Sequence, residues 1–217
     1  MICGGVVLLL VLAAGLWKQE FPSASWRYKI TVEVETPEGI KTGSVVRETQ
    51  ASTDVRVGDV GGGSAGTIGE AVVVDLGKRQ YLVGLLPEGD DLSLAMGGPP
   101  PGTREGMAYY SHLKEGKASL MMKGALPHFV TFKNPDDPMT VENVDGQDLA
   151  KTFGDGVTLK DVTIEITDAP MTWGPLNTYL PWLEGLKGAY LNGSHFGSRD
   201  VPLGLHAGNF QYKGNRK

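Results

Sequence analysis

Cysteine is almost absent from this chain of 217 residues, which contains Cys3 alone. A single cysteine cannot form an intramolecular disulfide, and it leaves a cysteine-based metal site without ligands. The histidines offer no substitute, because even the closest pair in sequence, His195 and His206, is too widely spaced to present two ring nitrogens from one helical face. The sequence therefore predicts a fold stabilised by packing, with no metal site.

Positive charge is also scarce. The chain has 20 lysines and arginines against 25 acidic residues, a net charge of −5, and its basic residues cluster only at the very end, at Lys213, Arg216 and Lys217. Proteins bind nucleic acids through a basic surface, so the net negative charge argues against a nucleic-acid partner. Hydrophobic residues make up 41% of the chain and charged residues 21%, which excludes a charge-rich disordered chain.

The first residues form an apolar run. Residues 2–17 contain no charged side chain, and as a helix they would extend roughly 24 Å, close to the lower limit for spanning a bilayer. Residues 1–25 are therefore predicted to be a signal peptide or a membrane anchor helix, with the membrane as partner through residues 2–17. Whether the segment is cleaved stays open.

The orientation of the chain has two readings. Export would place the rest of the chain in the periplasm or on the outer side of a bacterial membrane. The charges favour an alternative, because Lys18, Arg27 and Lys29 follow the apolar run and none precedes it, which by the positive-inside rule describes an anchor with a cytoplasm-facing domain.

From Trp26 onward the pattern is that of antiparallel hairpins. Apolar residues alternate with polar ones over 28–35, a proline and glycine turn follows at 36–39, and residues 40–49 form the returning strand, with Gly43 as a candidate bulge. A second pair of apolar segments, 71–76 and 80–86, is joined by a short turn. Four antiparallel strands are thus expected before residue 90.

The second half of the chain mixes short elements. Extended character is predicted for 126–132, a capped helix for 147–153, an alternating strand around 162–166 and a helical face around Pro181, where the helix must kink or restart. The predicted fold is α+β: antiparallel β-hairpins forming a sheet with a few short helices, preceded by an N-terminal hydrophobic helix. Residues 26–217 are expected to form one domain.

Glycine is abundant, with 31 residues, and it is concentrated in two places. Six glycines lie within 58–69, and 97–102 reads Gly-Gly-Pro-Pro-Pro-Gly inside the longer irregular stretch 87–106. Both stretches, 58–69 and 87–106, are predicted to be glycine-rich loops, because glycine and proline there leave few side chains for packing.

A set of short segments spread over most of the chain after residue 25 carries a resemblance to known sequences. These segments are 26–39 with Gly43-Ser44, Leu126-Pro127, Val130-Thr131-Phe132, Asp137-Pro138, Phe153-Gly154 with Gly156-Val157, Ile164-Glu165-Ile166-Thr167, Leu180-Pro181-Trp182-Leu183 and Leu205-His206-Ala207-Gly208. Together they resemble a family of uncharacterised proteobacterial proteins with a hydrophobic N-terminus. The resemblance implies a bacterial source and one unit after residue 25. It implies no activity and no catalytic residue.

The first glycine-rich stretch contains two formal catalytic or cofactor motifs. Gly61, Gly63 and Gly66 match G-x-G-x-x-G, but a dinucleotide site needs this motif between a strand and a helix, and here a strand is predicted to follow, so no cofactor is expected. Residues 62–66 match G-x-S-x-G, which would make Ser64 a nucleophile with His206 downstream as its base. The same context argues against this, because the hydrolase elbow also needs a strand-to-helix turn.

The sequence thus predicts a membrane-anchored or exported bacterial envelope protein that acts as a binding or scaffolding module with a protein partner in the envelope. The alternative is a serine hydrolase that uses Ser64 and His206. The first reading depends on the apolar segment 2–17 joined directly to a strand-rich domain.

Overall fold

The structure is a computed structural model that describes residues 23–53, 63–197 and 199–214. The predicted signal peptide or anchor helix falls almost entirely on residues outside this part of the chain. Within the described residues, no helix is both long and apolar enough to cross a membrane.

The larger of two antiparallel sheets has six strands in the order β10-β3-β2-β1-β9-β6. Its strands are β1 (Ser23–Thr36), β2 (Gly39–Ser52), β3 (Ser64–Glu70), β6 (Lys117–Ser119), β9 (Thr158–Ile166) and β10 (Gln211–Tyr212). The predicted first hairpin is confirmed: β1 pairs with β2 over its whole length and the chain reverses between Thr36 and Gly39. The predicted strand at 162–166 is confirmed as part of β9, which pairs with β1.

The smaller sheet has four strands in the order β4-β5-β7-β8. They are β4 (Val72–Asp75), β5 (Tyr81–Gly84), β7 (Phe129–Phe132) and β8 (Val141–Val144). The β4–β5 pair is the predicted second hairpin. The chain passes from the larger sheet to the smaller one at Ala71, between β3 and β4, so the hairpins form two sheets where one was expected.

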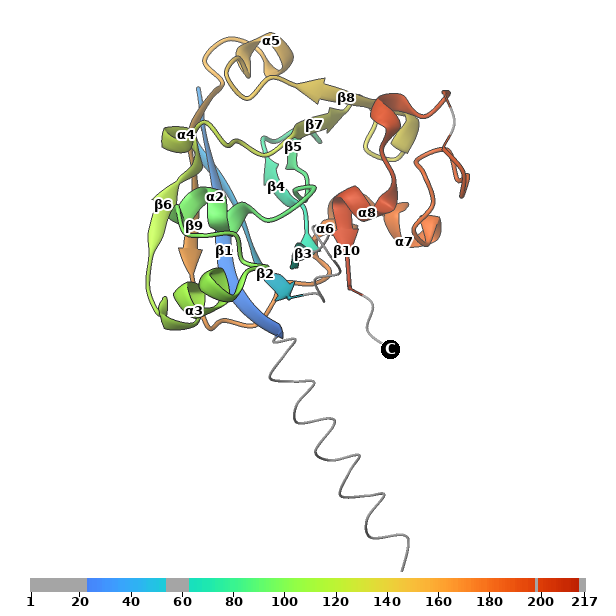
Figure 1. Cartoon of the computed structure of the whole chain (residues 1–217). Helices are drawn as coiled ribbons and strands as arrows, with labels where there is room; N and C mark the ends of the chain where they lie inside the picture. The colour runs from blue at the N-terminus through green and yellow to red at the C-terminus, as the bar shows by residue number, and fades with distance from the viewer. Residues whose placement is uncertain (1–22, 54–62, 198, 215–217) are drawn as a thin grey trace, which may run out of the picture.

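Short helices complete the fold. They are α2 (Asp91–Met96), α3 (Arg104–His112), α4 (Leu120–Lys123), α5 (Ala150–Phe153), α6 (Pro175–Tyr179), α7 (Leu183–Leu186) and α8 (Ala207–Phe210), with 3₁₀ turns η1 (Pro138–Thr140) and η2 (Pro202–Gly204). In Figure 1 the smaller sheet lies between the long strands β1 and β2 on one side and the C-terminal helices α6, α7 and α8 on the other. The protein is thus an α+β fold with antiparallel sheets and a few short helices.

The smaller sheet is buried on both faces, because alternate residues of its strands enter two different hydrophobic clusters. Val72 and Val74 of β4 face the larger sheet, whereas Val73 between them faces the C-terminal helices. The inner core lies between the sheets and comprises Tyr28, Ile30, Val32, Val34, Val45, Val72, Val74, Leu82, Leu92, Ala95, Tyr110, Leu120, Phe129, Val144, Leu149, Val157, Val162 and Ile164. The outer core comprises Ala71, Val83, Leu85, Val130, Phe132, Val141, Leu176, Leu180, Leu183, Leu191, Val201, Leu205, Ala207 and Phe210.

Gly43 is not a bulge. It pairs in regular register with Val32. A Cβ atom at this position would lie 2.0 Å from the backbone oxygen of Val73 in β4. Glycine is required there because the two sheets approach each other backbone to backbone.

The predicted glycine-rich loops are also partly wrong. Residues 64–69, within the first predicted loop, belong to β3, because 64–68 pair with β2 from Glu48 to Ser52 and Gly69 pairs with Tyr212 of β10. The second predicted loop, 87–106, contains α2 and the beginning of α3. Helix α2 forms because the Asp90 carboxylate accepts a hydrogen bond from Ser93 N at 2.8 Å and Gly97 adopts the left-handed conformation that ends it.

The predicted helices of the second half are shorter than expected. Helix α5 covers only the last residues of 147–153, because Asp145 closes a turn onto Gln147 N at 2.9 Å instead of capping the helix. Around Pro181 the helix restarts as predicted, with α6 before it and α7 after it.

Candidate functional site

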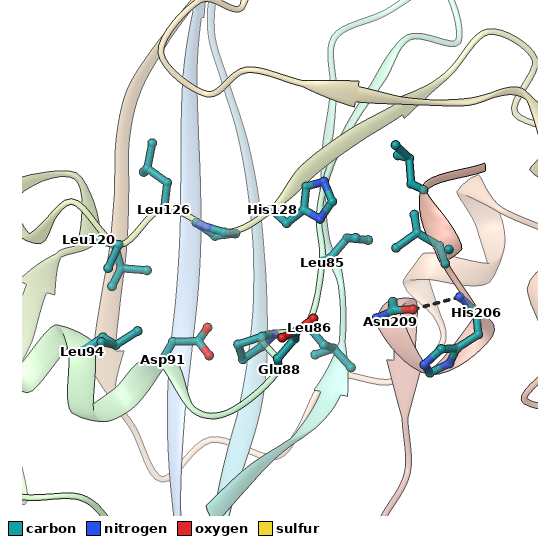
Figure 2. A pocket seen from close by; sticks show the side chains of 16 residues that line it. Leu85, Leu86, Glu88, Asp91, Leu94, Leu120, Leu126, His128, His206 and Asn209 are labelled. Atoms are coloured by element: carbon teal, nitrogen blue, oxygen red, sulfur yellow. Dashed lines mark hydrogen bonds between the residues drawn. The ribbon is translucent and has the colours of Figure 1, made fainter. Parts of the chain in front are cut away.

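A pocket of about 490 Å³ opens where three distant segments of the chain meet (Figure 2). Its floor continues β5, where Leu85 N donates to His128 O at 3.0 Å and Leu86 N donates to Asn209 O at 2.9 Å. These two hydrogen bonds bring the start of β7 and the end of α8 to opposite sides of one extended segment. The lining residues are Leu85, Leu86, Pro87, Glu88, Asp91, Leu94, Leu120, Ala125, Leu126, Pro127, His128, Leu203, Gly204, Leu205, His206 and Asn209.

A buried ion pair holds part of the pocket wall in place. Arg47 on β2 is fully buried, and its Nη1 lies 3.1 Å from Oδ2 of Asp91, the first residue of α2. The rest of the guanidinium bonds main-chain oxygens: Nε donates to Glu70 O at 2.9 Å, and Nη2 donates to Gly84 O at 3.1 Å and Leu85 O at 3.4 Å. Arg47 therefore joins both sheets to α2, and it fixes the Asp91 side chain at the pocket wall.

Tyr28 completes this network. Its hydroxyl donates to Asp91 Oδ1 at 3.2 Å and lies 3.4 Å from Oγ1 of Thr67, which in turn donates to Gly89 O. Burial raises the pKa of Asp91 above the usual carboxyl value, and the Arg47 guanidinium offsets part of the rise. Burial, together with the Asp91 carboxylate, raises the pKa of Tyr28 well above that of a free phenol.

Two histidines line the pocket, and each has one ring nitrogen already occupied. His206 Nδ1 accepts a hydrogen bond from Gly208 N at 3.0 Å, so the neutral ring carries its proton on Nε2. His128 Nε2 lies 2.7 Å from Oδ1 of Asn143, which makes Nε2 the donor and leaves Nδ1 as an acceptor. Both rings are thereby held in defined orientations beside the cavity.

Two exposed leucines from distant segments of the chain line the pocket. Leu94 on α2 is 57% exposed, and Leu203 on η2 is 49% exposed. The backbone of Leu203 has φ 56°, a left-handed conformation that costs a residue with a Cβ roughly 1–2 kcal/mol. Strain of this kind clusters at functional sites, where the surrounding structure holds it in place.

The structure does not bring Ser64 and His206 together. Ser64 begins β3, and its Oγ lies 3.1 Å from Oγ of Ser52, beside a different opening formed by the start of β1 and the end of β2. His206 lies near the other end of β3, where Gln211 pairs with Glu70. Ser64 also lies within a strand, so the geometry lends the serine hydrolase alternative no support.

No protein-family model, no curated protein and no solved structure matches this chain. The resemblance to uncharacterised proteobacterial proteins therefore stays a prediction. Within the part of the chain that the structure describes, no three histidine, cysteine or acidic side chains gather as metal ligands.

Sequence reasoning missed most of this pocket and found only His206 among its residues. The lining comes from 85–94, 120–128 and 203–209, which no local motif connects. One signal was available: Arg47 falls in phase with Val45 and Thr49 on β2, and a charged residue in the apolar phase of a strand marks a buried charge that needs a partner.

Proposed function

We propose that this protein is a ligand-binding module of the bacterial envelope, and that the pocket between α2, the start of β7 and α8 is its binding site. The observation that carries the proposal is the pocket itself. Its volume falls in the range of small-molecule sites, and its wall combines leucines and prolines with a few oriented polar groups, the pattern by which such sites combine affinity with specificity.

The polar groups support recognition because they are held before any ligand arrives. Asp91 is fixed by Arg47 and Tyr28, and each histidine is fixed by the hydrogen bond at its occupied nitrogen. A binding site whose side chains are already ordered loses less conformational entropy when a ligand binds.

The proposed location in the envelope rests on the apolar segment 2–17 and on the short stretch of sequence between this segment and the first strand. The described chain enters β1 at Ser23, so only a few residues separate the proposed anchor from the sheet. Alkaline phosphatase is active only outside the cytoplasm, so export predicts that a fusion of this enzyme after Lys217 is active. Activity only from a cytoplasmic reporter in the same position would support the cytoplasm-facing alternative and overturn export.

The pocket can be tested on the full chain in membranes by thiol protection. Cys3→Ser removes the native thiol, and Leu126→Cys then places a reporter in the pocket wall, with Met122→Cys as an exposed control that does not line the pocket. Hexan-1-ol is expected to slow maleimide alkylation at position 126 and to leave the rate at 122 unchanged. Equal effects at the two positions would overturn the binding function.

A further inference from the structure

We propose that the pocket selects a protonated primary amine carried on an aliphatic body, and that Glu88 supplies the charge that recognises the ammonium group. This inference rests on the proposed binding function and names the ligand class for the same pocket.

The charge of the pocket wall is negative. Glu88 and Asp91 both line it, and no lysine or arginine side chain does so within the described part of the chain. The Asp91 charge is balanced at 3.1 Å by Arg47, whereas Glu88 is exposed and makes no ion pair with a described residue. The uncompensated charge of the site therefore belongs to Glu88.

Arg47 cannot serve an anionic ligand instead. Its side chain is fully buried, and its donors are directed to Asp91 and to the main-chain oxygens of Glu70, Gly84 and Leu85. A carboxylate or phosphate in the pocket would meet Glu88 without a cation to balance it, which disfavours fatty acids and phosphorylated ligands.

The ligand body is aliphatic because leucine, proline and alanine make up most of the remaining wall. Leu94 and Leu203 remain about half exposed beside the cavity, and Leu203 holds a strained backbone at that place. Covering these side chains would remove apolar surface from water. His128 also lines the cavity, and its free Nδ1 offers an acceptor to an ammonium N–H. Figure 2 shows His128, Glu88 and Asp91 around the same cavity.

The test uses the full chain in membranes with Leu126→Cys as reporter and three probes of equal chain length: hexylammonium, hexan-1-ol and hexanoate, at pH 7.5. Hexylammonium is expected to reach half-protection at a concentration about fivefold lower than hexan-1-ol, as one partly exposed ion pair would produce. Hexanoate is expected to protect least.

A matched pair of variants assigns the preference to Glu88. Glu88→Gln should bring hexylammonium to the level of hexan-1-ol, whereas Glu115→Gln removes the same charge from an exposed position outside the pocket and should leave the fivefold advantage intact. Equal protection by hexanoate and hexylammonium, or an advantage that survives Glu88→Gln, would overturn the inference while hexan-1-ol protection still upheld the binding function. Loss of protection by hexan-1-ol itself would overturn the binding function.

Discussion

The inner and outer cores are built from different chemistry although they share the smaller sheet. The inner core encloses ionisable side chains, with Tyr110 in the cluster and Tyr28 in contact with the Arg47–Asp91 pair. The outer core is apolar and aromatic: Phe132, Trp182 and Phe210 pack with ring centroids 5.5 to 6.0 Å apart. One side of the sheet is therefore organised by directional hydrogen bonds and the other by ring packing.

The two faces of the smaller sheet are covered by layers that are held in place in different ways. The inner layers are long strands whose register is set by backbone pairing, and Arg47 adds a tie by bonding oxygens of β3 and β5 at once. The outer layer consists of helices of four or five residues, which cannot stabilise themselves and depend on the surface they cover. Substitutions in the two cores should consequently differ in how much unfolding free energy they cost and in how much of the fold they destabilise.

The largest effect is expected in the inner core, from Arg47→Met. The change leaves the Asp91 carboxylate buried without its cation, which typically costs about 3–5 kcal/mol of unfolding free energy. Urea unfolding followed by tryptophan fluorescence measures it. Arg27→Met, which breaks the exposed pair with Glu48, should cost less than about 1 kcal/mol. Equal costs would refute the claim that the buried pair organises the inner core.

A smaller effect is expected in the outer core, from Leu180→Ala. Leu180 is fully buried between α6 and α7, and truncation of a buried leucine costs about 2–5 kcal/mol, at the low end where short helices can relax into the cavity. Hydrogen exchange should lose protection in residues 175–210 while β1 and β2 keep theirs. Equal loss in β1 and β2 would show that the two cores unfold as one unit.

The same contrast decides what the sequence could predict. The first hairpin was predictable because its alternation and its turn at 36–39 are local, and β1 and β2 pair in the register that they imply. Strand β3 was not, because its glycine-rich residues are held by pairing with β2, a long-range interaction without a local signature. Gly43 shows the same limit, since the need for glycine comes from Val73 on the other sheet.

The outer core and the pocket were the least predictable parts. Helix α8 and strand β10 lie beyond the last element predicted from the sequence, and their places are set by contacts such as the hydrogen bond from Ala71 N to Phe210 O at 2.6 Å. His206 was singled out as a base for Ser64, but its neighbours in the structure are Tyr190 and Gly208. The sequence paired His206 with Ser64, and only the topology shows that His206 shares a pocket with Glu88 and His128.

The smallest change in unfolding free energy at neutral pH is expected from Tyr110→Phe, a substitution in the inner core. Burial, and after it the Asp90 carboxylate, raises the pKa of Tyr110 to about 12. Below roughly pH 9 the phenol is neutral in both the folded and the unfolded chain, so the substitution should leave the pH dependence of stability unchanged there. Between about pH 10 and 12 the unfolded chain releases this proton while the folded chain retains it, so wild-type stability must fall as the pH rises. Tyr110→Phe should flatten part of this fall in urea unfolding measured from pH 9 to 12, and the part that remains includes the contribution of buried Tyr28, whose pKa is also raised. A fall that is equally steep in the wild type and in Tyr110→Phe would mean that Tyr110 does not contribute to the alkaline sensitivity of the inner core.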